Sequence, residues 1–404
     1  MLWYYIYYFI IYNIMKVKII DIAYGGYGVA KPDNYNKVIF IPHSVDGDIL
    51  DIEIIKEKKN IAFAEIKNIL KPSEYRIIPE CKYASICGGC AFNHIDYDKQ
   101  LYFKKRILES SIRNIDYNNT IEIITQKESS RDYRLRVNIL AREGKIGFYK
   151  FNTNDFVEID DCIVLKKSLL EKIKQFVYSN NITANIYQVE NEKNESLAFI
   201  ELLEKTKNID YSFFDGCTIK YKKSVKHYGL KNILYTTKYG DISISNQSFF
   251  QANRFLLDRF QDEAIRYIEN NSSVVELYSG SGFFTSVIYS KTKNVISSEI
   301  SDSALLGKQY NIKKESAFDT LHNYNNTLDC LFVDPPRDGL NKKVIKEILR
   351  IKPKSIIYIS CNPMTFSRDI MILKDSYVLV DLKIIDMFVD TYHIELISFL
   401  KIKN

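Results

Sequence analysis

Two side chains near the C-terminal end have the types that covalent catalysis uses. Cys361 follows the apolar run Ile356–Ser360, and Glu395 is the only acid in the apolar run 393–402. A free cysteine taken alone is more often a small buried hydrophobic residue than a nucleophile. A thiolate that attacks an electrophilic carbon, together with a carboxylate that accepts a proton, is the pair that nucleophilic catalysis requires. The pair is therefore a candidate active site if the fold brings the two residues together.

A second group of residues is typical of nucleotide binding. The run Val274–Tyr278 leads into Gly280-Ser281-Gly282, a turn that lets a ligand approach the backbone closely. Phe283 follows where a dinucleotide site would continue toward a third glycine, which disfavours a phosphate cradle and NAD. Glu299 lies about 20 residues farther on, where an acid binds ribose hydroxyls. This pattern favours S-adenosylmethionine, and an ordinary tight turn with a surface glutamate is the alternative.

Two further polar residues lie next to apolar runs. Asp334 follows Cys330–Val333 and precedes two prolines, which either frame a flat base or simply end a strand. Gln251 lies in the sequence SFFQAN, where it is either a ligand contact or a polar residue at a helix start. Because ligands bind at the carboxyl ends of parallel strands, we expect Glu299, Asp334 and Cys361 to lie along one sheet edge with the glycine turn.

The cysteines favour a metal site. Seven cysteines, an odd number spread unevenly, argue against a disulfide framework. Cys81, Cys87 and Cys90 are close in sequence, and Cys162 can supply a fourth thiolate. Spacing alone allows either tetrahedral zinc or an iron–sulfur cluster. We interpret His94 as a surface histidine and not as a fifth ligand.

The elements that must position these residues divide the chain in three. Residues 16–70 alternate apolar and polar residues in four or five short runs, which predicts a small antiparallel barrel. Residues 71–240 form a mixed α/β region with the cysteines and a helix over 95–115, which is a candidate to pack on the C-terminal domain. Residues 241–404 alternate β-branched runs with helical segments, which predicts an α/β domain with a buried, mainly parallel sheet.

Charge and hydropathy limit the partners. The 404 residues carry a formal net charge of +6, which permits an anionic partner without resembling a histone-like binder. Lysine and arginine residues on a predicted helix, on a strand and in a dense group are candidates for RNA phosphate contacts: Lys99, Lys104, Lys105, Arg106, Arg131, Arg134, Arg136, Lys220, Lys222, Lys223 and Lys226. The apolar start, residues 1–14, is too short to span a bilayer and lacks a basic leader. We expect Met15 to be the real start, and a cytoplasmic protein without membrane contact.

The motifs together resemble the RNA uracil-5 methyltransferases, a family that includes 23S ribosomal RNA and tRNA enzymes. The resemblance extends over residues 16–404 and rests on CKYASICGGC with the later Cys162, on SFFQAN, ELYSGSG and DPPRDG, and on SCNP followed by HIE. It implies a Rossmann-like S-adenosylmethionine methyltransferase domain, an N-terminal OB-like TRAM barrel and a central cluster-binding α/β domain.

The resemblance also implies a reaction and a set of residues. The reaction is C5-methylation of a uridine in 23S ribosomal RNA to 5-methyluridine, with Cys361 as nucleophile and Glu395 as base. The residues that match the family's S-adenosylmethionine contacts are Gln251, Tyr278, Glu299 and Asp334. The residues that match its [4Fe–4S] ligands are Cys81, Cys87, Cys90 and Cys162. A target uridine in a loop, or flipped out of its helix, is required because a stacked base is out of reach.

The sequence departs from the family's pattern in two places, and it allows two alternative functions. The chain reads DMFVDT where the family often has proline and histidine, and the segment between Glu299 and Asp334 is short, so Asp319 is only a weak candidate for the adenine contact. The same motifs fit methylation of the T-loop of tRNA. A catalytically silent RNA-binding iron–sulfur protein is a third reading, which the intact Cys361 and Glu395 disfavour. DNA is not an expected partner, because Pro363 follows Cys361 where DNA cytosine-5 methyltransferases have Pro-Cys.

Overall fold

The computed structural model describes residues 14–126 and 130–403. The expectation about residues 1–14 therefore falls, except for Ile14, outside the described residues. The chain forms two compact units. Unit 1 holds residues up to 110 together with 150–152 and 389–393, and unit 2 holds 111–149, 153–388 and 394 onward. Within the described part of the chain, no helix is both long and apolar enough to cross a membrane.

Unit 1 begins with a curled six-stranded sheet. Its order is β1-β5-β6-β4-β3-β2, formed by β1 (Ile14–Lys18), β2 (Asp21–Ala23), β3 (Tyr27–Ala30), β4 (Val38–Pro42), β5 (Ile49–Glu57) and β6 (Ile61–Lys71). Alternate residues of these strands, including Ile39, Leu50 and Ile52, form one buried core. The expected antiparallel pairing is correct except for β4 and β6, which pair in parallel. Gly28 is required by packing, because a Cβ there would lie 1.9 Å from the Ser44 hydroxyl oxygen.

After β6, the chain continues with a loop and a helix. The loop over residues 72–96 carries the cysteine group and leads into α2 (Tyr97–Ile112), which confirms the predicted helix. Phe103 of α2 packs with Phe92 and Ile95 in a second small core. Lys104 is fully buried. The prediction that Lys104 contacts RNA phosphates is therefore wrong, because the helix turns this residue away from solvent.

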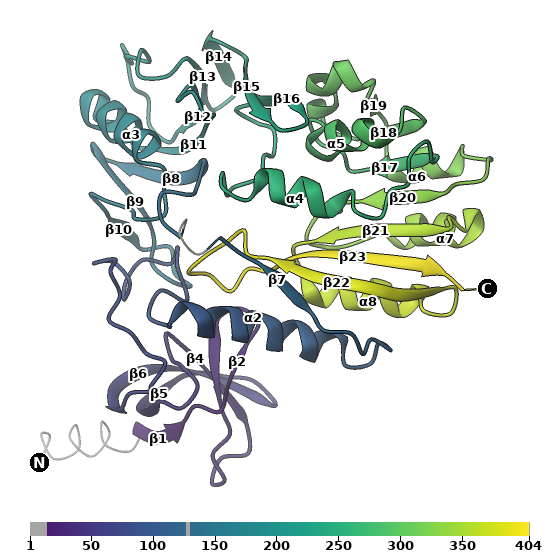
Figure 1. The fold of residues 1–404 in the computed structure, drawn as a ribbon. Coiled ribbons are helices and arrows are strands. Elements are labelled where there is room, and N and C mark those ends of the chain that lie inside the picture. The colour runs from purple at the N-terminus through teal and green to yellow at the C-terminus, as the bar shows by residue number, and fades with distance from the viewer. Residues whose placement is uncertain (1–13, 127–129, 404) are drawn as a thin grey trace, which may run out of the picture. The chain divides into compact units, whose positions relative to one another are not determined.

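Unit 2 contains a seven-stranded sheet and an eight-stranded sheet (Figure 1). The first has the order β10-β9-β8-β11-β12-β13-β14 and packs α3 (Lys167–Asn180), whose buried face includes Leu169, Ile173 and Phe176. Its strands are β8 (Arg136–Arg142), β9 (Lys145–Tyr149), β10 (Phe156–Glu158), β11 (Ala184–Glu190), β12 (Ser196–Leu202), β13 (Gly216–Tyr221) and β14 (Ser224–Gly229). A hairpin of β15 (Asn232–Thr237) and β16 (Gly240–Ser245) follows in sequence.

The eight-stranded sheet has the order β19-β18-β17-β20-β21-β23-β22-β7. Its strands are β7 (Glu122–Ile124), β17 (Val274–Leu277), β18 (Val295–Glu299), β19 (Lys313–Lys314), β20 (Cys330–Val333), β21 (Ser355–Ser360), β22 (Tyr377–Ile385) and β23 (Glu395–Ile402). The helical elements of this part are α4 (Leu257–Ala264), α5 (Phe283–Lys291), the 3₁₀ helix η2 (Asp302–Tyr310), α6 (Ala317–His322), α7 (Lys342–Ile351) and α8 (Pro363–Leu373). The predicted α/β domain with a mainly parallel sheet is confirmed. The exception is β23, which runs antiparallel between β21 and β22.

Candidate active site

The register of two neighbouring strands brings Cys361 and Glu395 together. β21 and β23 are antiparallel, and their last pair at this edge is Ser360 with Leu396. Cys361 follows Ser360 and Glu395 precedes Leu396, so both residues lie next to this last pair. Glu395 is buried, whereas Cys361 is partly accessible. A ligand at this edge can therefore reach the thiol.

Three ionisable side chains share this edge, the thiol of Cys361 and the carboxyls of Glu395 and Asp334. Burial, with the charges of Glu395 and Asp334, raises the pKa of the Cys361 thiol to about 12. Burial and the charge of Asp334 also hold the pKa of Glu395 well above its ordinary value. Burial of the Asp334 carboxyl, with the charges of Glu276 and Glu299, raises its pKa to about 7. Each of these groups therefore resists ionisation, and a cationic ligand at this edge would favour their charged forms.

Two arginines oppose these carboxylates. The charge of Arg337 lowers the pKa values of Cys361 and Glu395, and Arg136 acts in the same direction on Glu395. The Arg337 loop is fixed to the Cys361 turn, because the Arg337 carbonyl accepts hydrogen bonds from Asn362 Nδ2 at 3.1 Å and from Thr365 Oγ1 at 2.9 Å.

Arg136 is a site residue that sequence reasoning treated only as a phosphate contact. Burial lowers the pKa of its guanidinium, which lies 4.0 Å from the centre of the Phe249 ring. Phe249 is 57% exposed, so one face of this ring is available to a ligand. The signal in the sequence was weak, since Arg136 is far from Glu395 along the chain and belongs to the other sheet of unit 2.

The glycine turn and Glu299 form a second part of the site. Gly280 N donates to Glu299 Oε2 at 3.1 Å, and Ser301 N donates to Glu299 Oε1 at 2.7 Å. Tyr278 has a φ of 63°, a left-handed conformation that turns the chain sharply at the end of β17. Burial raises the pKa of Tyr278 to about 12. These contacts fix the carboxylate of Glu299 beside the turn, as the sequence predicts for a ribose contact.

A pocket of about 790 Å³ opens beside this turn. Tyr278 and Glu299 line it, with Phe318, Pro336 and Leu340 among the apolar residues. Its size is within the range of small-molecule sites. Asp319, the weak candidate for an adenine contact, does not line the pocket, and its carboxylate accepts the Ser316 hydroxyl at 2.5 Å. Glu315 and Ser316 line the pocket instead.

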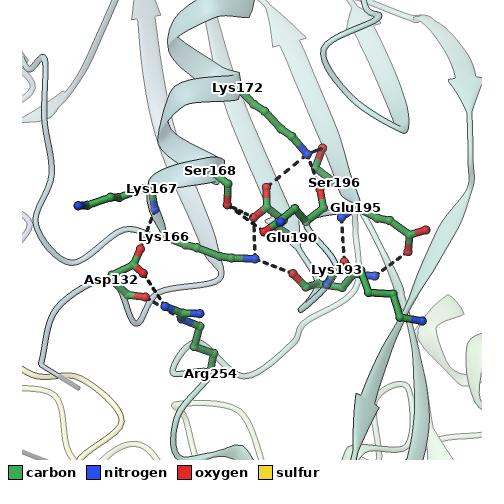
Figure 2. Close-up of polar contacts among 12 residues, drawn as sticks. Asp132, Lys166, Lys167, Ser168, Lys172, Glu190, Lys193, Glu195, Ser196 and Arg254 are labelled. Carbon is green, nitrogen blue, oxygen red and sulfur yellow. Dashed lines mark hydrogen bonds and ion pairs between the residues drawn. The ribbon is translucent and has the colours of Figure 1, made fainter. Parts of the chain in front are cut away.

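The segment that carries Gln251 is hydrogen-bonded to the residues that precede Arg136. Leu135 N donates to the Ala252 carbonyl at 2.9 Å, and Arg254 N donates to the Tyr133 carbonyl at 3.0 Å. The Arg254 guanidinium pairs with the Asp132 carboxylate, whose other oxygen accepts Lys167 N at 2.7 Å (Figure 2). Gln251 itself is buried at 4% exposure.

Residues before Arg136 also form backbone hydrogen bonds with the segment that follows Cys162. Asp132 N donates to the Ile163 carbonyl at 2.9 Å, and Arg134 N donates to the Val164 carbonyl at 2.9 Å. Next to these bonds, Lys166 and Lys172 pair with the fully buried Glu190 (Figure 2). The segment that follows Cys162 is therefore hydrogen-bonded to residues 132–134 of unit 2.

The other three predicted metal ligands lie in unit 1. All three thiols are partly accessible, and Gly89 N donates to Cys87 Sγ at 3.4 Å. Burial raises the pKa of the Cys87 thiol, the hydrogen bond from Gly89 opposes this effect, and the charge of Cys81 adds to it. Among the described residues, no group of three or more His, Cys, Asp or Glu side chains meets the geometry of a metal site.

His94 is not the surface histidine that the sequence predicted. It is buried, and burial lowers its pKa to about 3. Its ring is therefore neutral at physiological pH, because burial and the charge of Arg76 outweigh the opposing effect of the Asp48 carboxylate.

Comparison with protein families identifies two parts of the chain. Residues 319–403 match the tRNA (Uracil-5-)-methyltransferase family, and residues 13–67 match the TRAM domain. The first stretch contains Asp334, Cys361 and Glu395. A Fusobacterium nucleatum RNA methyltransferase is 31% identical, with 97% of this chain and 96% of that protein covered. The chain belongs to the RNA uracil-5 methyltransferase family.

Other family members agree over the full length. An Aquifex aeolicus RNA methyltransferase is 28% identical over 96% of this chain and 99% of its own length. The crystal structure of the Pyrococcus abyssi tRNA (uracil-54, C5)-methyltransferase, in complex with S-adenosyl-L-homocysteine, has the same fold. It matches with a TM-score of 0.76 and 22% identity over 96% of this chain and all of that one. This RNA uracil-5 methyltransferase therefore combines a methyltransferase fold with an N-terminal TRAM domain.

Proposed function

We propose that this enzyme methylates C5 of a uridine in 23S ribosomal RNA through a covalent adduct of Cys361. The position of Cys361 next to Glu395, at the edge that also carries Asp334, supports this proposal most directly. The T-loop of tRNA is the second candidate substrate, because the matching family model is described as a tRNA uracil-5 methyltransferase.

Uracil C5 is a poor nucleophile toward the methyl group of S-adenosylmethionine. The enzyme therefore needs a nucleophile of its own that first activates the base. The Cys361 thiolate adds to C6, and the electron pair of the C5–C6 double bond moves into an enolate. C5 of the enolate then takes the methyl group from the sulfonium of S-adenosylmethionine, which leaves as the neutral thioether. The C5 proton is removed last, and the C6–S bond breaks to restore the double bond and the free thiolate.

Glu395 is the base that we assign to the C5 proton. Its raised pKa makes its carboxylate a stronger base than one in water, which suits removal of a weakly acidic proton. Arg136 and Arg337 keep this carboxyl able to ionise.

The thiol needs help to ionise, since its pKa is about 12 when no ligand is bound. The concentrated carboxylates raise that pKa, so a sulfonium held near Asp334 would offset part of their effect. We assign Tyr278, Glu299, Asp334 and Gln251 to binding of S-adenosylmethionine. The pocket beside Tyr278 and Glu299 supports this assignment.

We also propose a [4Fe–4S] cluster on Cys81, Cys87, Cys90 and Cys162. The spacing of the cysteines and the hydrogen bond from Gly89 N to Cys87 Sγ support it, because backbone N–H groups that donate to sulfur are common at such clusters. The role that we assign to it is structural, since methyl transfer from S-adenosylmethionine moves no electrons.

The experiment uses labelled S-adenosylmethionine with the wild type and Cys361→Ala. Each protein receives unmodified 23S ribosomal RNA and unmodified tRNA in parallel, and digested products are analysed for 5-methyluridine. Label in ribosomal RNA that disappears in Cys361→Ala supports the proposal. Label in tRNA alone keeps the mechanism and replaces the substrate. Absence of label in both, with S-adenosylmethionine bound, favours a silent RNA-binding protein.

A further inference from the structure

A second pocket lies beside β13 and β14, the last two strands of the seven-stranded sheet of unit 2. It has a volume of about 510 Å³ and lies between the loop over residues 203–210 and the β13–β14 hairpin. Lys205, Lys207 and Lys226 line it, together with Tyr221 and Tyr228. The basic side chains come from both the loop and the hairpin, so they converge on one space from different parts of the chain.

The charge around this pocket is not balanced. Residues 201–231 contain seven lysines and four carboxylates. Lys220 is paired with Glu201 at 2.7 Å, and Asp215 lies 3.9 Å from Lys172. Within the part of the chain that the structure describes, Lys205, Lys207 and Lys226 form no ion pair, so the pocket favours an anion.

Aromatic rings accompany these lysines. Tyr228 stacks on Tyr211 with ring centres 3.9 Å apart and planes 23° from parallel. Lys222 occupies the hairpin turn with a φ of 53°, and its ammonium lies 5.4 Å from the Tyr221 ring. Lysines that follow a backbone, combined with rings that stack on bases, are the features that bind single-stranded nucleic acid.

Protection of a sheet edge does not account for all three lysines. β14 is the last strand of its sheet, and lysines on edge strands prevent aggregation. This explains Lys226 on β14. Lys205 and Lys207 lie on a loop that presents no strand edge, so their convergence on the same pocket needs another reason.

We propose that this pocket binds backbone phosphates of single-stranded RNA that flanks the target uridine, an inference that rests on the proposed function. In the sheet order, β14 is four strands away from β8, which begins at Arg136 beside the active site. Strands are about 4.8 Å apart, so the separation across the sheet is about 19 Å. The pocket therefore holds RNA a few nucleotides away from the uridine and not the uridine itself.

The test measures how RNA binding depends on salt. The full-length wild type and a Lys205→Gln/Lys207→Gln/Lys226→Gln variant are titrated by fluorescence anisotropy with a labelled oligoadenylate of about 20 nucleotides, which exceeds a typical single-stranded site. An RNA without uracil keeps the measurement independent of the Cys361 adduct. Each phosphate contact contributes about 0.7 to the slope of log affinity against log salt. We expect the slope of the variant to fall by about 2.

A matched control carries the same change of charge elsewhere on unit 2. Lys346, Lys374 and Lys403 are exposed, and their replacement by glutamine should leave the slope unchanged. An unchanged slope in the pocket variant, or an equal fall in the control, would overturn the proposal. If triple replacement impairs folding, as judged by circular dichroism, Lys226→Gln alone is measured, with an expected fall of about 0.7. A wild type that binds with the full slope and methylates no RNA would refute the proposed function, and of this inference only the binding of RNA phosphates would stand.

Discussion

Cys361 comes directly after Ser360 and Glu395 directly before Leu396, and Ser360 and Leu396 are the last pair of the antiparallel β21–β23 ladder. The register of the two strands therefore brings the thiol and the carboxyl to the same edge of the sheet. Burial and the charge of Glu395 both raise the pKa of the Cys361 thiol.

This relationship predicts a trapped intermediate. Glu395→Gln removes the base and keeps the size and position of the side chain, so the adduct forms, is methylated and does not resolve. Turnover should fall by at least about 100-fold, in the range typical for loss of a general base. Denaturing gels should contain a protein–RNA band that is absent in Cys361→Ala/Glu395→Gln. Rapid turnover by Glu395→Gln would contradict the assignment.

The reactivity of Cys361 should depend on Asp334. The Asp334 carboxylate raises the pKa of the thiol, so Asp334→Asn should lower that pKa and increase the thiolate fraction. A decrease of one in the pKa corresponds to about tenfold more thiolate at neutral pH. Because the pKa of Asp334 is itself about 7, the difference should be present above pH 7 and vanish below it, where the carboxyl is protonated.

Alkylation by iodoacetamide, followed by mass spectrometry of the Cys361 peptide, measures this effect. Asp375→Asn is a control at an exposed position of the same unit. Equal alkylation rates of Asp334→Asn and wild type at pH 8 would argue against electrostatic coupling of the two groups.

Glu276 should make the protein less stable as pH rises. It is buried, and burial raises its pKa from 4.5 to about 7, although Thr285 and Ser297 each donate a hydrogen bond at 2.6 Å. The folded state therefore binds this proton more tightly than the unfolded state, and stability is lost as pH rises from about 4.5 to 7. A change of this size corresponds to about 3 kcal/mol.

Chemical denaturation of wild type and Glu276→Gln between pH 5 and pH 8 tests this prediction. The glutamine variant should gain stability relative to the wild type over this interval, by up to about 3 kcal/mol. Glu269→Gln, at an exposed position, is the control. A stability difference that stays constant with pH would mean that folding does not raise the pKa of Glu276.

The proposed cluster predicts a loss of bound iron in Cys87→Ala. The wild type, purified without oxygen, should contain iron and sulfide and absorb visible light, and the variant should contain neither and unfold more easily. Cys217→Ala changes a buried cysteine outside the group and should retain the iron. A colourless wild type that contains zinc would replace the cluster with a zinc site.

The sequence determined much of this architecture through short-range patterns. The runs at residues 274–277, 295–299, 330–333 and 355–360 are short and rich in apolar residues, which is typical of buried strands, and all four are strands. The glycine turn with an acid about 20 residues later was likewise readable, because turn and strand end lie close along the chain. The spacing of apolar residues predicted helix α2. It did not predict the burial of Lys104, because burial depends on what packs against the helix.

Only the tertiary structure decided which distant residues meet. β23 inserts antiparallel between β21 and β22, and a local pattern does not specify strand order, yet this order is what carries Glu395 to Cys361. Long-range pairing also brings Arg136 near Glu395. In the same way it brings Lys205 and Lys226 to one pocket. Residue type and spacing thus specify the chemistry that is available. Long-range pairing specifies which groups act together, because electrostatic coupling depends on distance in space and not along the chain.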